Sequence, residues 1–532
     1  MTGNLFSTIT DAAPDPSTVL AELPDGSSTT YAEAFALAAR FANALEDLGV
    51  EPGDRVAVQV EKSWSAVVLY LGCLRAGAVY LPLNPAYTAV EVEHFLRDAE
   101  PRVLVCDPER FDRLASLAQE TGVVHVETMG ADGRGSLLHR AVSQLAERAD
   151  AIRAGSDLAA ILYTSGTTGR SKGAMLTHDN LRSNAQALVE CWRFTPDDVL
   201  VHALPIFHTH GLFVATNVVL LSGGSMIFQP GFDAAEVLAA LGRATALMGV
   251  PTFYTRLLQL PGLTREAVAG VRLFVSGSAP LLAETHAAWS ERTGHAILER
   301  YGMTETNMNT SNPYDGERRP GTVGFPLPGV EIRVVDPESS RTVATDVVGV
   351  LEVKGPNVFS GYWRQPEKTA EEFRADGFFI TGDLAAVDGD GYVRIVGRAK
   401  DLVISGGLNV YPKEVEEAID ELPGVAESAV FGVPTRTSAR PSSPPSCPRA
   451  ARSWSKRRCS VRSVTGWRGS SSPSGCSWST SSRATRWRRC RRTSCATSSD
   501  RRSPDDGPAH RGAARRAGGL GVRGASSVRS GP

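Results

Sequence analysis

Short apolar strands alternate with helical segments along the first half of the chain, and this alternation constrains the fold more than any other feature. Helical apolar periodicity marks residues 31–49, 64–76 and 179–190, while short apolar runs such as 103–107 and 246–249 are typical of buried strands. Because consecutive parallel strands need a crossover, usually a helix, the sequence predicts an α/β fold with parallel sheets. Further along, short strands with Gly and Pro turns predict a small β subdomain.

The last 98 residues, 435–532, have a composition that cannot build a packed core. They contain one leucine, no isoleucine, phenylalanine, tyrosine or methionine, and only three of the 58 acidic residues in the chain. Such a segment buries too little apolar surface to offset its chain entropy, so we expect a disordered Arg/Ser-rich tail. Its positive charge would also suit a nucleic-acid-binding segment. Arg-Ser repeats and interleaved aromatics are missing, and nucleic acid is therefore not the expected partner.

The cysteine pattern and the apolar stretches predict a cytoplasmic protein. Cys73, Cys106 and Cys191 precede the tail and are far apart, which is typical of a reduced compartment. The N-terminus has no basic region followed by an apolar core, so no signal peptide is expected. The longest apolar stretch, 66–83, is interrupted by Arg75 and by glycines, which argues against a membrane span.

A glycine-rich loop, YTSGTTGRSKG at residues 163–173, carries the strongest local signal. It follows a predicted strand and precedes a predicted helix. Its backbone N–H groups, its hydroxyls and the charge of Lys172 are the groups that wrap a polyphosphate. The spacing is not that of a Walker A motif. The expected phosphate ligands are Thr164, Ser165, Gly166, Thr167, Thr168, Gly169 and Lys172.

This loop resembles the phosphate loop of the acyl-adenylate-forming superfamily, which includes AMP-binding acyl-CoA synthetases, luciferases and peptide-synthetase adenylation domains. Further strings match that superfamily in the same order, namely SGSAP (276–280), YGMTE (301–305), TGD (381–383), GRAKD (397–401) and SGGLNVYP (405–412). The resemblance implies an ATP-dependent acid–thiol ligase that forms an acyl-adenylate and then an acyl-CoA thioester, with ATP, Mg²⁺ and coenzyme A as partners.

The resemblance also implies a domain organisation. A large AMP-binding domain spans 1–397, and a small α+β C-terminal domain begins at 398 and is truncated at 434. Lys400 lies where the superfamily has its hinge, although a loop lysine is the plain alternative. Residues expected at coenzyme A are Ser405, Gly406 and Gly407. An adenylation module that serves a carrier protein remains an alternative within the superfamily.

Several side chains acquire expected roles from the resemblance. Glu305 and Thr168 would hold Mg²⁺, Asp383 would bind the ribose hydroxyls, and Arg398 would reach the ribose or the phosphates. Each has a plain alternative as a surface or turn residue. The expected catalytic residues are Lys172, Thr304, Glu305 and Arg398. The remaining residues expected around the nucleotide are Ser276, Gly277, Ser278, Ala279, Arg300, Tyr301, Gly302 and Met303.

Two arginines suggest the acid. Arg300 directly precedes the nucleotide motif, and a pocket arginine is costly without an anionic partner, which a second substrate carboxylate would supply. With Arg256 in VPTFYTRLL, the pattern resembles malonyl-CoA synthetases and implies malonate or methylmalonate. An ion pair of Arg300 with Glu299 or Glu305, and a surface position for Arg256, are the alternatives. The expected acid-binding residues are His208, Thr209, Arg256, Ser276, Arg300 and Met303, with His208 and His210 as core histidines in the alternative reading.

Other features leave a monocarboxylic acid open and point to a shifted reading frame. The string KDLVISGGLNVYPKEVE resembles fatty-acyl-CoA synthetases, so a medium- or long-chain fatty acid is the alternative substrate. The superfamily also has a lysine near its C-terminus, in a string like P-R-N-x-x-G-K, which 435–532 lacks. Synonymous codons for 435–444, read two bases later, encode Pro-Asp-Phe-Gly-Glu-Ala-Val-Val-Ala, a natural continuation of the preceding strand. The same frame gives PRNAMAKVQK around Arg488 and Arg489. We therefore expect a frameshift near residue 434 and poor adenylation by the chain as written.

Overall fold

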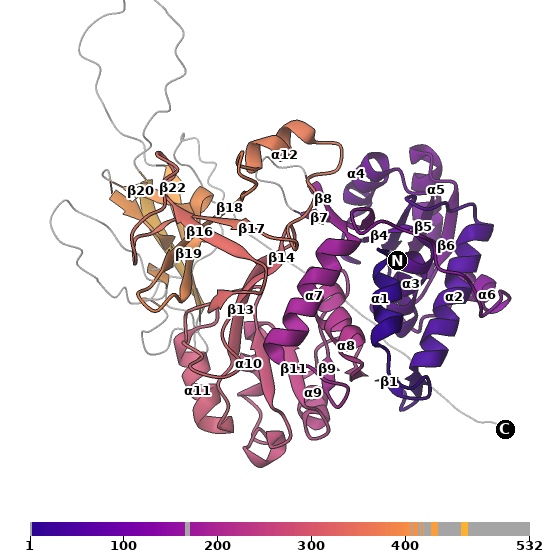
Figure 1. Ribbon diagram of the computed structural model, residues 1–532, viewed down its shortest axis with the longest axis horizontal. Coiled ribbons are helices and arrows are strands. Elements are labelled where there is room, and N and C mark those ends of the chain that lie inside the picture. The colour runs from indigo at the N-terminus through magenta and orange to yellow at the C-terminus, as the bar shows by residue number, and fades with distance from the viewer. Residues whose placement is uncertain are drawn as a thin grey trace, which may run out of the picture.

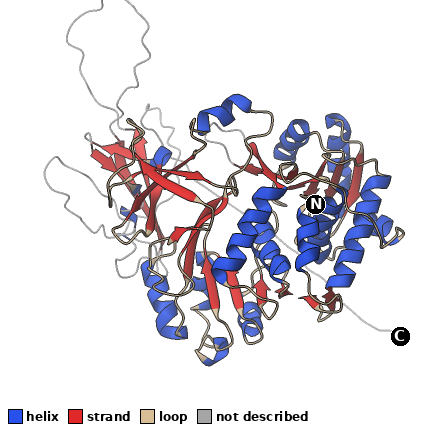
Figure 2. Ribbon diagram, in the orientation of Figure 1, coloured by secondary structure: helices blue, strands red, loops and turns tan. Residues whose placement is uncertain are grey.

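The computed structural model describes residues 3–164, 171–405, 408–412, 415–416, 419, 427–434 and 459–466. Two large sheets with helices packed between and around them form the body of the molecule, and a smaller β subdomain adjoins the second sheet (Figures 1 and 2). The predicted α/β fold with parallel-sheet subdomains and a small β subdomain is confirmed. No described helix has both the length and the apolar character that a bilayer crossing requires.

The first sheet has six strands in the order β6-β5-β3-β4-β7-β8. Its strands are β3 (Arg55–Gln59), β4 (Val79–Pro82), β5 (Val103–Cys106), β6 (His125–Thr128), β7 (Leu158–Thr164) and β8 (Lys172–Thr177). All neighbours are parallel except β7 and β8, which are antiparallel. The loop that joins β7 to β8 is the glycine-rich loop, so this hairpin places it at the edge of the sheet.

The second sheet has nine strands in the order β15-β14-β13-β12-β11-β9-β10-β1-β2. Its strands are β1 (Val19–Glu22), β2 (Ser28–Thr30), β9 (Val199–His202), β10 (Ser225–Phe228), β11 (Ala246–Gly249), β12 (Leu273–Ser276), β13 (Leu298–Met303), β14 (Asn307–Ser311) and β15 (Phe325–Pro326). The strands from β1 to β13 in this order are parallel, whereas β2, β14 and β15 join antiparallel.

Helices fill the space between the two sheets and cover their outer faces. The helices that pack against one another in the interior are α1 (Leu5–Ala12), α2 (Tyr31–Asp47), α3 (Trp64–Ala76), α7 (His178–Trp192) and α8 (Asn217–Ser222), with α6 (Ser136–Val142) against α2 and a π-helical turn (His210–Thr216) before α8. The outer helices are α4 (Ala89–Ala99), α5 (Phe111–Thr121), α9 (Ala234–Leu241), α10 (Pro251–Leu257) and α11 (Ala283–Thr293). In β3, Val56 and Val58 face the interior helices while Ala57 faces α4, as the alternation of side chains along a strand requires.

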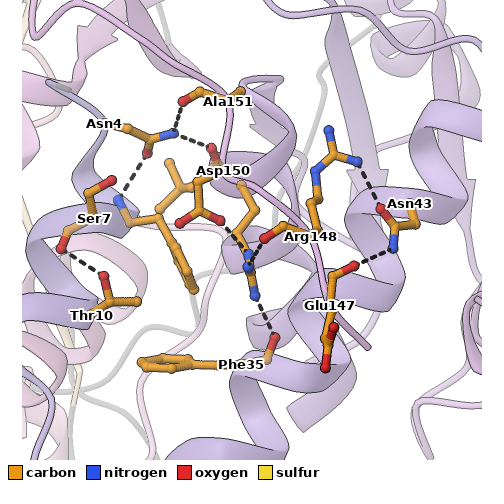
Figure 3. A network of polar contacts seen from close by, with 12 residues as sticks. Asn4, Ser7, Thr10, Phe35, Asn43, Glu147, Arg148, Asp150 and Ala151 are labelled. Atoms are coloured by element: carbon orange, nitrogen blue, oxygen red, sulfur yellow. Dashed lines mark hydrogen bonds and ion pairs between the residues drawn. The ribbon is translucent and has the colours of Figure 1, made fainter. Parts of the chain in front are cut away.

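Polar contacts tie the N-terminal segment to the interior helices (Figure 3). The Asn4 side chain caps α1 and donates to the carbonyl oxygens of Leu74, at 2.8 Å, and Ala151, at 3.0 Å. Arg75, at the end of α3, pairs with Asp150 at 2.6 Å. Since α1 is only two turns long, these contacts and its buried apolar face hold it in place.

The small β subdomain is an antiparallel sheet in the order β16-β17-β18-β19, and α12 is inserted between β17 and β18. These elements are β16 (Glu331–Val335), β17 (Gly349–Lys354), α12 (Pro366–Glu372), β18 (Phe379–Val387) and β19 (Val393–Arg398). Two strand pairs follow, β20 (Val403–Ser405) with β21 (Leu408–Val410) and β22 (Glu427–Pro434) with β23 (Cys459–Gly466). The composition of 435–532 did not predict β23, which is the part of that tail that the structure describes.

Candidate active site

The glycine-rich loop joins two antiparallel strands rather than a strand and a helix. Thr164 ends β7 and pairs across the hairpin with Lys172, which begins β8. The predicted helix over 179–190 is confirmed, since α7 starts at His178, but the sequence did not predict that strand β8 separates it from the loop. Strand β8 forms here since KGAMLT buries Ala174 and Leu176 on one face. The expected phosphate ligands Ser165, Gly166, Thr167, Thr168 and Gly169 lie outside the described residues.

Lys172 is buried and reaches a carboxylate that the sequence did not suggest. Its Nζ lies 3.0 Å from Oε1 of Glu372, the last residue of α12, and 4.3 Å from the ring centroid of Tyr362. The Tyr362 hydroxyl donates to Oε2 of Glu372 at 2.7 Å. Lys172, Tyr362 and Glu372 thus form one group of contacting side chains.

Glu305 belongs to the same group. Its Oε1 lies 3.1 Å from the Tyr362 hydroxyl and 3.4 Å from the Thr164 Oγ1 hydroxyl, which donates to it. The carboxyl is only 6% exposed, and this burial raises its pKa above the ordinary range for glutamate. The alternative of a solvated surface acid is therefore wrong. Thr304 is half-buried in the turn before it. Carboxylate and hydroxyl oxygens are the ligands that Mg²⁺ prefers, so Glu305 and Thr164 fit this ion.

A second polar group surrounds Asp383 on β18. Oδ1 of Asp383 pairs with the Arg398 Nε at 2.6 Å, and Oδ2 accepts a hydrogen bond from the Tyr301 hydroxyl. Asp383 and Arg398 meet because β18 and β19 place them in register. Burial raises the pKa of Asp383 even though the charge of Arg398 opposes this shift. The Tyr301 hydroxyl is thus hydrogen-bonded to a buried carboxylate. Lys400 follows β19 in an exposed turn.

Arg300 on β13 is a buried cation without a counter-ion among the described residues. Its side chain is almost fully inaccessible, and its Nε and Nη2 groups have no hydrogen-bond partner in the part of the chain that the structure describes. No ion pair joins it to a carboxylate within the described ranges, so the alternative pairing with Glu299 or Glu305 does not form. Glu299 points to the opposite face of the strand, and its Oε1 accepts from the Gly321 N–H. Burial lowers the pKa of Arg300 to about 9.

Buried polar atoms without partners lie on the segments next to Arg300. Ser276 ends β12, the neighbouring strand, and its hydroxyl has no partner among the residues that the structure describes. The Thr209 hydroxyl and Nε2 of His210 are also buried and have no partner within the same described ranges. Burial and then the charge of Arg300 lower the pKa of His210. Because buried polar groups in native proteins normally have partners, these atoms mark a site for a polar ligand.

Other expected acid-binding residues have different surroundings. Arg256 is exposed, because α10 buries Phe253, Tyr254 and Leu257 and leaves Arg256 on the opposite face. This exposed position agrees with the surface alternative for Arg256. His208 is also exposed and lies against Phe207, so His210 is the buried histidine. No feature of the sequence distinguishes these two histidines by their burial.

The remaining expected residues take these positions. Met303 is half-buried at the end of β13, with its Sδ 4.0 Å from the Tyr301 hydroxyl. Gly302 cannot bear a side chain, because a Cβ would overlap the backbone of Asn307. Gly277 is buried, whereas Ser278 and Ala279 are exposed. Of the residues expected at coenzyme A, Ser405 ends β20, and Gly406 and Gly407 lie outside the described residues.

Comparison with known proteins gives the following likenesses. A sequence model of the AMP-binding enzyme family matches residues 10–363. A feruloyl-CoA synthase of Amycolatopsis sp is 37% identical over 417 residues, which are 77% of this chain and 81% of that protein. Among solved structures, ATP-bound MatB from Rhodopseudomonas palustris is 57% identical, with a TM-score of 0.83 over 89% of this chain and 90% of that one. A malonyl-CoA ligase with methylmalonyl-CoA and AMP bound is 38% identical, with a TM-score of 0.64 over 81% and 89% of the two chains.

Proposed function

The chain belongs to the AMP-binding enzyme family as an acyl-CoA ligase, and we propose that its acid substrate is a small dicarboxylate, malonate or methylmalonate. The observation that carries this proposal is the buried guanidinium of Arg300, two of whose donor groups have no partner in the described ranges. Burying an unpaired cation is expensive, and a carboxylate offers a planar acceptor that pairs with two guanidinium N–H groups. Ser276, Thr209 and His210 supply further polar atoms for the same anion.

The alternative acids fit this pocket less well. An octanoyl chain has no group that could pair with Arg300, so its binding would leave the cation buried and unpaired. The aromatic ring of feruloyl, the acyl group named for one relative, carries oxygen acceptors but no second carboxylate to neutralise Arg300. The malonyl-CoA ligase with methylmalonyl-CoA bound, which is 38% identical to this chain, supports the dicarboxylate.

We propose the following two half-reactions and a role in them for each site residue. A carboxylate oxygen of the acid attacks the α-phosphorus of ATP and pyrophosphate leaves. The thiol sulfur of coenzyme A then attacks the acyl carbon and AMP leaves. Lys172 balances phosphate charge, Asp383 accepts hydrogen bonds from the ribose, and Arg398 orients Asp383. Glu305 and Thr164 would hold Mg²⁺, which supplies charge neutralisation on the phosphates when bound.

We further propose that residues from 435 onward are read from a shifted frame. The restored frame supplies the lysine string that the superfamily uses for adenylation, whereas the written chain has only Lys456 in that range. The frame-restored protein should therefore adenylate its acid, and the written chain should bind ATP but adenylate slowly. Comparable rates from the two proteins, or an uninterrupted codon register through residue 435 on resequencing, would contradict this proposal.

The test of the acid is pyrophosphate release by the frame-restored protein with malonate, methylmalonate, octanoate and ferulate. We expect malonate or methylmalonate to have the highest kcat/KM. Arg300→Met should lower kcat/KM for the preferred acid by about 10²-fold, since truncating one partner of a buried charge pair costs roughly 2–5 kcal/mol. Arg256→Met is the matched control, because this arginine is exposed, and it should retain the wild-type preference. Equal activity on octanoate, or an unchanged preference in Arg300→Met, would overturn the dicarboxylate assignment.

A further inference from the structure

Helix α12 ends in Glu372, whose carboxylate lies beside the phosphate-loop residue Lys172, although the two residues are far apart in the sequence. Figure 1 shows α12 outside the β subdomain, on the side of the molecule where the β7–β8 hairpin lies. Glu372, its last residue, has a side chain that is 21% exposed and contacts Lys172 from 200 positions away. The Tyr362 hydroxyl and the Lys368 Nζ, at 3.0 Å, are its other partners. Glu372 is therefore held by three donors.

Lys172 has a built-in counter-ion before any nucleotide arrives. Its side chain is 7% exposed, and Glu372 is its ion-pair partner among the described carboxylates. The amine also lies over the Tyr362 ring. A buried lysine needs such a partner, since an unpaired ammonium in this environment would be costly. In the nucleotide complex, a phosphate oxygen would satisfy the same ammonium.

The Tyr362 hydroxyl lies between two carboxylates, those of Glu372 and Glu305, and favours the ionised form of only one of them. The hydroxyl has one proton but lies within hydrogen-bond distance of both Glu372 and Glu305. Burial opposes ionisation of Glu372, but the hydrogen bonds from Tyr362, Lys368 and Lys172 outweigh it, and the pKa of Glu372 is lowered. The charge that faces Lys172 is therefore that of Glu372.

We propose that Glu372 is an internal substitute for phosphate, which holds Lys172 in position in the empty site and competes with the phosphates of ATP for it. The inference rests on the proposed function, because it requires the glycine-rich loop to bind a polyphosphate. ATP must replace the Lys172–Glu372 ion pair by a Lys172–phosphate ion pair. Breaking the Lys172–Glu372 ion pair opposes binding, so Glu372 lowers the net affinity for ATP and pyrophosphate.

Glu372→Gln isolates the charge, because the amide oxygen of glutamine can still accept from Tyr362 and from Lys172. Calorimetric titration of the full chain should show ATP and pyrophosphate binding to Glu372→Gln about fivefold to tenfold more tightly than to the wild type, an effect of the size expected for a partly buried ion pair. Adenosine, which has no phosphate, should bind equally to both proteins. The matched control is Glu371→Gln, since Glu371 is exposed and pairs only with Lys368 among the described residues. It should have wild-type affinity for all three ligands.

The outcomes separate the inference from the proposed function. Equal or weaker binding of ATP and pyrophosphate by Glu372→Gln would overturn the competition. An equal gain in adenosine affinity would also overturn it, because a change in the whole site would then be responsible. ATP binding by neither protein would contradict the proposed function itself. Glu372→Asp keeps the charge but shortens the side chain, and it should give a smaller gain than Glu372→Gln.

Discussion

Gly277 lies directly against the guanidinium of Arg300, so closely that a Cβ at position 277 would overlap it. Gly277 follows β12, and Arg300 is on β13, the neighbouring parallel strand. The missing side chain at 277 therefore leaves the space that the buried cation occupies. The position of Arg300 depends on the residue type at 277 as well as on its own backbone.

Gly277→Ala should displace the Arg300 guanidinium from its buried position. We expect KM for malonate to rise about tenfold, because a misplaced bidentate partner loses roughly one charge-assisted hydrogen bond. The affinity for adenosine should change much less. Pyrophosphate release measured against malonate concentration checks this, with Gly231→Ala as the control, since a Cβ there meets no atom within 4 Å. Equal KM values for Gly277→Ala and the wild type would contradict the prediction.

Glu305→Gln should change how the stability of the ligand-free protein depends on pH. Burial raises the pKa of Glu305 in the folded state above its value in the unfolded chain. Its contribution to stability is therefore fully present below the unfolded pKa, about 4.3, and is lost as the pH rises through the folded pKa. Urea unfolding should show Glu305→Gln to be more stable than the wild type at pH 8, with the difference shrinking toward pH 4. If the free energies of unfolding of the two proteins differed by the same amount from pH 4 to pH 8, the raised pKa of Glu305 would be contradicted.

The sequence predicted the sheets and the Arg300 position, but it could not predict contacts between distant segments. Arg300 could be singled out because it adjoins a recognisable motif. The exposure of Arg256 was not predicted, although the apolar spacing of Phe253, Tyr254 and Leu257 would have indicated that Arg256 faces outward. Glu372 lies in an ordinary polar helix, and only the tertiary packing of α12 brings it to Lys172. Local periodicity contains no information about such a pairing.

The existence of β8 shows a similar limit. The sequence predicted a helix over 179–190, and α7 begins at His178, but it did not predict that residues 172–177 between the loop and this helix form a strand. Six residues are too few to separate a strand from the first turns of a helix by periodicity. Pairing with β7 decides the outcome, because it satisfies backbone groups that a helix end would leave open.

His178 should make the protein less stable in mild acid. Its Nδ1 accepts a hydrogen bond from the Leu5 N–H at 3.1 Å, and burial, followed by the charge of Arg153, lowers its pKa to about 4. The unfolded chain therefore binds a proton that the folded protein excludes, and stability present above pH 6.5 is lost as the pH falls toward 4. At pH 5 the loss should be about 2 kcal/mol relative to pH 7. Urea unfolding of His178→Gln should show a flatter profile, and an unchanged profile would refute this role.

Asp383→Asn should weaken the binding of any ligand that carries ribose hydroxyls. The carboxylate is oriented by Arg398 and Tyr301, and charge-assisted hydrogen bonds from a ribose are worth roughly 1.5–3 kcal/mol each. We expect the affinities for ATP and for adenosine to fall together by about tenfold to 10²-fold, unlike the effect of Glu372→Gln, which should spare adenosine. The analogue 2′,3′-dideoxy-ATP should bind equally to the variant and the wild type, because it lacks both hydroxyls. Asp376→Asn is the control, since this exposed residue pairs with Arg333 in the same β subdomain. A loss of dideoxy-ATP affinity as large as that of ATP would mean that Asp383 acts through the fold rather than through the ribose.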